Sequence, residues 1–232
     1  MNKKLSGLVG IFLSVVILVY FEIFSYKVLD AVGMNVSNYS SVIQTIINLI
    51  IKFIMCFIVY MIYKKDFRSK KGNDSLLKNV LLFVIGLITT VVGMYLFSFV
   101  VKYIGDIFDV SVIEKSFYNI FDKKLDLDLI IKILSDYVVV PYLYCSIILL
   151  SVDKLVKRND TFIVLSGLLA SIIHALTLSG TLGFVIVNSL STLLLFSLFA
   201  FIYRKNSSIW FLIVLYSFYL ISNVFIINYL GW

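Results

Sequence analysis

Charged residues, histidine, cysteine and proline are all scarce in this 232-residue sequence. Only 14% of its residues are charged and 61% are hydrophobic, whereas about a quarter of a soluble globular protein is charged. This scarcity of charge argues against a soluble domain of useful size. It predicts an all-α integral membrane protein in which residues 1–232 form one polytopic membrane domain within the lipid bilayer.

The residues that usually hold cofactors are also few. The chain has one histidine, His174, and two cysteines, Cys56 and Cys145, which fall in separate apolar segments. Such a set is poor metal ligation, so we expect no metal and interpret the cysteines as packing residues. No glycine-rich phosphate loop is present, which argues against a nucleotide. We therefore expect no cofactor, and we attribute the net charge of +7 to membrane topology rather than to nucleic acid.

The apolar residues form seven segments, each close to the roughly 20 residues that cross a bilayer. The first segment follows a basic N-terminus and runs to about Phe24 without a small-residue cleavage site, which predicts an uncleaved helix. The other six cover residues 42–63, 79–104, 129–151, 161–178, 182–203 and 209–230. We expect about seven transmembrane helices in a single bundle. Ser179–Thr181 should form a tight hairpin between the fifth segment, 161–178, and the sixth, 182–203.

Lysine and arginine gather at the N-terminus and in the segments after the second, fourth and sixth helices. Acidic residues are more numerous in the segments on the other side. Basic residues favour the cytoplasmic side of a membrane. The pattern predicts a multi-pass protein of the cell membrane with a cytoplasmic N-terminus and an extracytoplasmic C-terminus.

A few ionisable residues fall inside the predicted spans, where charge is costly. Lys52 lies near the middle of the second helix and needs a partner or water. Asp136 lies about 10 Å deep in the fourth helix. Lys132 precedes it by one helical turn, so this lysine could already pair with its charge. Glu22 lies near the outer end of the first helix and is weaker evidence for a site.

His174 is the first candidate for a functional residue. In a helix it shares one face with three small residues, which other helices can approach closely: Gly167, Ala170 and Ser171. Its predicted depth matches that of Asp136, Asn188 and Asn223 on three other helices. This layer suits either a catalytic or ligand cavity, or interhelical hydrogen bonds that fix the packing.

Pro141 is the only proline and lies in the middle of the fourth helix. It cannot donate a hydrogen bond to the carbonyl of Tyr137, and its ring crowds that carbonyl, so we expect a kink. Such a kink serves either to shape a cavity or only to pack the helix.

Three stretches in the second half resemble the CPBP family, which comprises CAAX-protease and bacteriocin-processing (Abi-type) membrane proteins. They are YVVVPYLYCSIILL, LLASIIHAL and YRKNSSIWFLIVLYSFYLISN, within a core of about residues 129–228. The family carries a Glu-Glu-x-x-x-Arg helix, a Phe-x-x-x-His helix and a His-x-x-x-Asn/Asp helix. The resemblance implies intramembrane peptidase chemistry, with glutamates and histidines that activate water and polarise a peptide carbonyl.

Most of the catalytic residues implied by this resemblance are replaced. His174 matches the second motif, but Ala170 stands in place of its phenylalanine. The third motif aligns with Tyr216 and Leu220, or, after a shift of three residues, with Tyr219 and Asn223. The Glu-Glu and Arg positions fall near Val139, Val140 and Tyr144. Because valine cannot act as a general base, the resemblance implies a degenerate member of the family.

Three hypotheses follow for function. The first is a membrane scaffold, a regulator or a bacteriocin-immunity-like factor that binds another membrane protein or a peptide. The second is an active intramembrane endopeptidase with a rearranged site, in which Asp136 is the base, His174 its partner and Asn223 a further candidate. The third is a transporter or ion pathway that uses Lys52, Asp136 and His174. We favour them in this order.

Overall fold

The computed structural model describes residues 5, 7–12, 16, 18, 19, 33, 40–69, 76–107, 127–178 and 182–230. Within these residues the regular structure is helical throughout. Five stretches are long and apolar enough to cross a membrane: Val42–Phe67, Lys78–Phe97, Ile130–Leu155, Asn159–Thr177 and Leu182–Asn206. Helices satisfy their own backbone polar groups, which a bilayer requires. The all-helical prediction is confirmed for this part of the chain, and its five long apolar helices could span a membrane.

The helices follow the predicted segments closely. In chain order they are α2 (Ser41–Ser69), α3 (Leu76–Ile107), α4 (Leu127–Leu134), the π-helical turn η2 (Ser135–Val139), α5 (Val140–Leu155), α6 (Asn159–Thr177), α7 (Leu182–Asn206) and α8 (Ile209–Leu230). α2 continues beyond the predicted end at residue 63, because a charged helix end is stable once it leaves the apolar layer. The first predicted helix lies largely outside the described residues, as does the Ser179–Thr181 hairpin.

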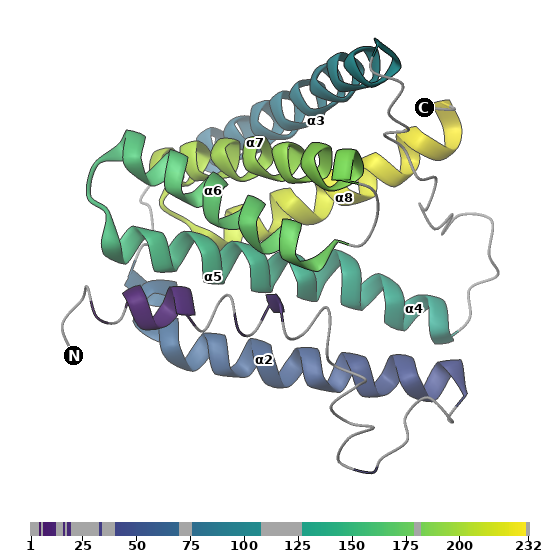
Figure 1. Cartoon of the computed structure of the whole chain (residues 1–232). Coiled ribbons are helices and arrows are strands. Elements are labelled where there is room, and N and C mark those ends of the chain that lie inside the picture. The colour runs from purple at the N-terminus through teal and green to yellow at the C-terminus, as the bar shows by residue number, and fades with distance from the viewer. Residues whose placement is uncertain are drawn as a thin grey trace.

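Successive long helices run in opposite directions (Figure 1). The ends of α2, α5 and α7 therefore lie together with the beginnings of α3, α6 and α8, and we name this the basic end. The basic residues of segments 64–65, 154–158 and 204–205 all belong to it. The alternation brings together the segments that the charge pattern assigns to one side of the membrane.

α5 is the central helix, and 61% of the apolar window that contains it is buried. Ile148 and Leu149 of this helix are fully buried, as are Phe162 of α6, Phe199 of α7 and Leu212 of α8. α5 packs against α2, α6 and α8. Residues on every side of α5 are therefore apolar, which agrees with its continuous run of apolar residues.

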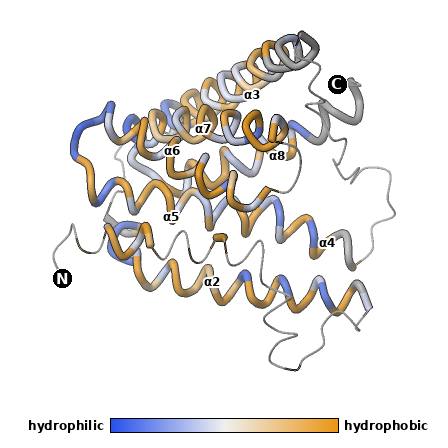
Figure 2. Tube along the Cα trace, viewed as in Figure 1, coloured by the Kyte–Doolittle hydropathy of each residue, from blue (hydrophilic) through white to orange (hydrophobic). Residues whose placement is uncertain are grey.

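α2 and α3 lie at the periphery, with only 11% and 17% of their apolar windows buried. α3 packs on α7 and α8, and α2 packs on α4, η2 and α5. Apolar residues predominate along α2 and are interrupted by a few hydrophilic positions (Figure 2). Since lipid is as apolar as these side chains, burial of apolar surface does little to hold α2 in place. The polar contacts of α2 therefore contribute a larger share of the interactions that hold it against the other helices.

Candidate functional site

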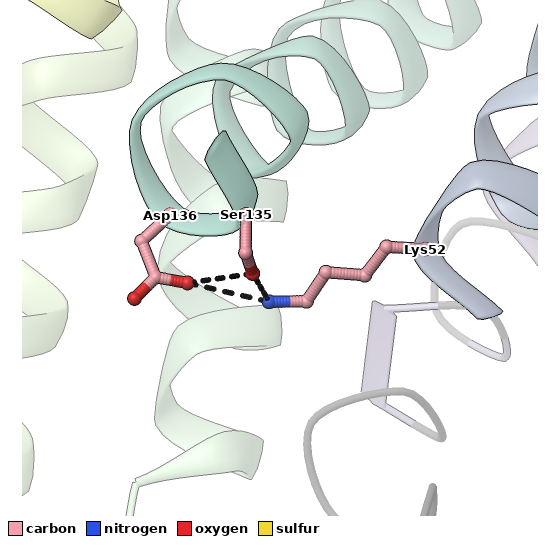
Figure 3. Close-up of polar contacts among 3 residues, drawn as sticks. All are labelled: Lys52, Ser135 and Asp136. Atoms are coloured by element: carbon pink, nitrogen blue, oxygen red, sulfur yellow. Dashed lines mark hydrogen bonds and ion pairs between the residues drawn. The ribbon is translucent and has the colours of Figure 1, made fainter. Parts of the chain in front are cut away.

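Lys52 of α2 reaches the π-helical turn η2 and forms the best-defined polar cluster inside the described spans (Figure 3). Its ammonium donates a hydrogen bond to the Ser135 hydroxyl at 2.5 Å and lies 3.4 Å from Oδ1 of Asp136. Ser135 in turn donates to the same Asp136 oxygen at 2.8 Å. The prediction that Lys52 needs a partner is confirmed.

The three side chains differ in their surroundings. The Lys52 side chain is only 9% exposed, whereas the Asp136 side chain is 60% exposed. Ser135 is buried. The cluster is thus a buried ammonium held by a hydroxyl and by one oxygen of a carboxylate that faces outward.

The local backbone explains how Ser135 and Asp136 come to meet Lys52. The N–H of Val140 bonds to the carbonyl of Ser135, five residues earlier, which defines a π-helical turn. Pro141 follows at the start of α5 and has no N–H to contribute. The turn before the proline is widened into a π-helix, a feature frequent at functional sites. The kink itself stays a prediction.

The partners in this cluster suit a charge pair better than a nucleophile. A lysine activates a serine nucleophile only when it is neutral and accepts the hydroxyl proton. Here Lys52 contacts the Asp136 carboxylate as well as Ser135, and Ser135 contacts the same carboxylate. A buried hydroxyl is also hard for a substrate to reach. The arrangement is that of a charge pair that joins two helices.

Asp136 pairs with Lys52, 84 residues earlier, and not with Lys132 one turn away. Lys132 has contacts of its own. The local pairing considered from the sequence is therefore replaced by an interhelical one, because η2 faces α2. Lys52, expected from the sequence to need a partner or water, lies at the centre of the cluster.

His174 lies near the end of α6 and is half-buried. Gly167, on the same face, packs so tightly that an added Cβ would lie 2.7 Å from the Leu193 carbonyl oxygen. The prediction that this small-residue face admits a close neighbour is confirmed. This contact sets the register of α6 on α7 and brings His174 to about the level of Asn188.

The imidazole of His174 has no hydrogen-bond or ion-pair partner among the residues that the structure describes. Asp136 is bonded to Lys52 and Ser135 instead. No direct hydrogen bond or ion pair therefore joins Asp136 to His174 among the described residues. Contact through one water, which the rearranged peptidase site also allows, stays a prediction.

Asn188, another member of the predicted polar layer, bonds within its own helix. Its amide donates to the carbonyl of Phe184 at 2.8 Å, one turn earlier. Asn223 lies one turn after Tyr219 on α8 and is half-buried. Hydroxyls on α3, α7 and α8 behave similarly, donating to carbonyls four residues back: Thr90, Ser191, Thr192, Ser217 and Ser222. Such bonds satisfy a polar group without joining helices.

Two further predictions concern Glu22 and the cysteines. Glu22 lies outside the described residues. Cys56 and Cys145 are free, and Cys145 is buried in the core as a packing residue. Within the described ranges no group of three His, Cys, Asp or Glu side chains could hold a metal ion.

A second polar network, at the basic end, was not identified from the sequence. Tyr63 of α2 is hydrogen-bonded to Ser151 of α5. One turn further along, Asp66 pairs with Lys154 at 3.0 Å. Arg204 of α7 pairs with Asp153 of α5 at 2.7 Å, and donates to the carbonyl of Val156. In the sequence these charges indicate only membrane topology. Polar residues one helical turn apart near the end of α2 are the signal from which the network could be predicted.

Polar contacts therefore join the peripheral helix α2 to η2 through Lys52, and to α5 through Tyr63 and Asp66. Comparison of the chain with protein-family models, with curated proteins and with solved structures gives no match in any of the three.

Proposed function

We propose that the chain is a non-catalytic scaffold or regulator in the cell membrane, which binds another membrane protein or a peptide. The observation that carries this proposal is the use of Asp136. Its carboxylate is engaged with Lys52 and Ser135, so the acid available for chemistry within the fourth predicted helix serves to join α2 to η2.

The resemblance to the CPBP family adds to this proposal. Val139 and Tyr144, which stand near catalytic positions of that family, are buried in the helix core. An apolar, closely packed α5 suits a family architecture that has lost its catalytic residues. A bacteriocin-immunity-like role would use such an architecture to occupy a membrane partner without cleaving it.

The exposed helices α2 and α3 are the surfaces that we assign to the partner. Phe57 of α2 is 64% exposed and Leu96 of α3 is 63% exposed. A photoreactive amino acid placed at either position should give one discrete protein adduct in native membranes, identified by mass spectrometry and by tagging the partner in turn. The adduct should survive His174→Ala and disappear in Gly167→Leu, which breaks the α6–α7 packing. His174-dependent cleavage of membrane peptides would instead support the peptidase.

We further propose a topology of about seven spans with a cytoplasmic N-terminus and an extracytoplasmic C-terminus. The gathering of lysine and arginine at the basic end supports it. Single cysteines introduced at Lys157 and near the C-terminus test it by labelling with an impermeant thiol reagent. We expect labelling of intact cells at the C-terminal cysteine only, and the reverse pattern contradicts the proposed orientation.

An ion pathway is the second candidate, because a lysine–aspartate pair within spans is costly and frequently functional. The outward-facing, 60%-exposed Asp136 carboxylate favours it. The purified protein in liposomes should then conduct protons or ions. Flux that is the same in Lys52→Leu, Asp136→Asn and the wild type would exclude this role for the pair.

A further inference from the structure

The basic end carries positive charge beyond what its own acidic residues neutralise. Asp66 is paired with Lys154, and Asp153 with Arg204. Asp160 is exposed in the first turn of α6, where the helix N-terminus favours a negative charge. Every acidic residue that the structure describes at this end is therefore already matched by a charge or a helix dipole.

Five basic residues remain exposed around these pairs, and we name them the basic rim: Lys64, Lys65, Lys157, Arg158 and Lys205. None of them forms an ion pair within the described part of the chain. Each of them lies within four residues along the chain of a member of the two ion pairs, and these pairs join the ends of α2, α5 and α7. Hydrophilic residues gather visibly where α5 passes into α6 (Figure 2).

The basic rim lies at the boundary between the apolar spans and the polar helix ends. Met61 is 56% exposed, and Phe201 and Trp210 are each 51% exposed at this same end. The Lys205 ammonium lies 5.6 Å from the centre of the Phe201 ring, which places a cation beside a lipid-facing aromatic group. Exposed tryptophan and snorkelling lysine are typical of the level where lipid headgroups lie.

We propose that the basic rim binds the phosphate groups of anionic phospholipid headgroups. Arginine matches a phosphate with paired donors, and lysine does so as a point charge. A soluble acidic protein would meet the same charges, but the adjoining exposed apolar side chains favour a ligand with acyl chains. This inference does not rest on the scaffold role and holds for a transporter equally.

Titration of the purified protein in neutral detergent with short-chain phosphatidylglycerol tests the proposal, with phosphatidylcholine as the neutral comparison. We expect phosphatidylglycerol to bind and phosphatidylcholine not to bind. Each basic residue near an anionic lipid contributes about fivefold in affinity. Lys157→Gln with Arg158→Gln should therefore weaken binding by about 25-fold. The charge-conserving exchange Lys157→Arg with Arg158→Lys should preserve it.

Lys123→Gln with Lys124→Gln is the matched control, because it also neutralises two adjacent basic residues, in the segment between α3 and α4. We expect no change in affinity. Equal losses from the two double variants, or equal binding of the two lipids, would overturn the proposal. Competition by inorganic phosphate at the concentration of the lipid would assign the site to free phosphate instead. Helical content and gel-filtration profile establish that each variant is folded.

Discussion

The Lys52–Asp136 pair predicts unequal effects of removing its two members. Lys52→Met removes the buried ammonium and leaves an outward-facing carboxylate that still accepts a hydrogen bond from Ser135. Asp136→Asn keeps the shape of the side chain but removes a negative charge from beside an ammonium that is only 9% exposed. Losing a charged partner costs a buried ion more than it costs a partly exposed one. The loss of the acid should therefore destabilise the protein more than the loss of the lysine.

The magnitude follows from the geometry. Two unit charges 3.4 Å apart attract by about 5 kcal/mol at an effective dielectric constant of 20. The 60% exposure of Asp136 leaves much of its charge screened, and exposed pairs contribute only about 0.2–1 kcal/mol. Hydrogen bonds between membrane helices reach about 1.7 kcal/mol. We expect a loss of about 2 kcal/mol for Asp136→Asn, about 1 kcal/mol for Lys52→Met and a coupling of about 1–2 kcal/mol.

The free energy of unfolding in mixed micelles, titrated with a denaturing detergent and followed by helical circular dichroism, measures these quantities. The double variant should be no less stable than Lys52→Met alone, because the acid matters only while the ammonium is present. Strictly additive losses, or a larger loss for Lys52→Met than for Asp136→Asn, would refute the reasoning.

Three other predictions concern packing and hydrogen bonding. Gly167→Ala should lower the free energy of unfolding by about 1–3 kcal/mol, because the added Cβ would lie 2.7 Å from a backbone oxygen of α7. Gly93→Ala is the control: its Cβ would lie 3.9 Å from the nearest neighbour, so the same assay should show no loss or a gain in stability. Asn188→Ala should cost less than about 0.5 kcal/mol, because its amide bonds only within α7, and a larger loss would reveal an interhelical role. Ser151→Ala should weaken the attachment of α2 at the basic end. Hydrogen exchange in α2 should then be faster than in the wild type, with a smaller change in α6.

The positions of the helices could be predicted from the sequence because bilayer thickness sets the length of an apolar span. The small face around Gly167 could be predicted for a similar reason, since helical periodicity alone brings its members together. Both are local properties of the chain. The seven-helix count stays a prediction.

The partners of individual polar residues could not be predicted. Asp136 has a lysine one turn away in sequence, yet its partner is Lys52, which only the packing of α2 on η2 brings near. Equal depth in the membrane is also not enough to predict that polar side chains meet, because depth does not fix the direction in which a side chain points around its helix. Asn188 accordingly bonds its own helix rather than joining a shared layer.

The 83 residues that separate Lys52 from Ser135 also separate them in time during synthesis. At about 5–20 residues per second, α2 leaves the ribosome roughly 4–17 s before η2 exists. Throughout that interval Lys52 has neither Ser135 nor Asp136 as a partner. A lysine at the centre of a span opposes insertion by about 2.5–3.5 kcal/mol, which about four to twelve leucine, isoleucine, phenylalanine or valine residues offset. The apolar side chains that contribute so little to holding α2 against α5 are therefore those that carry its charge into the membrane.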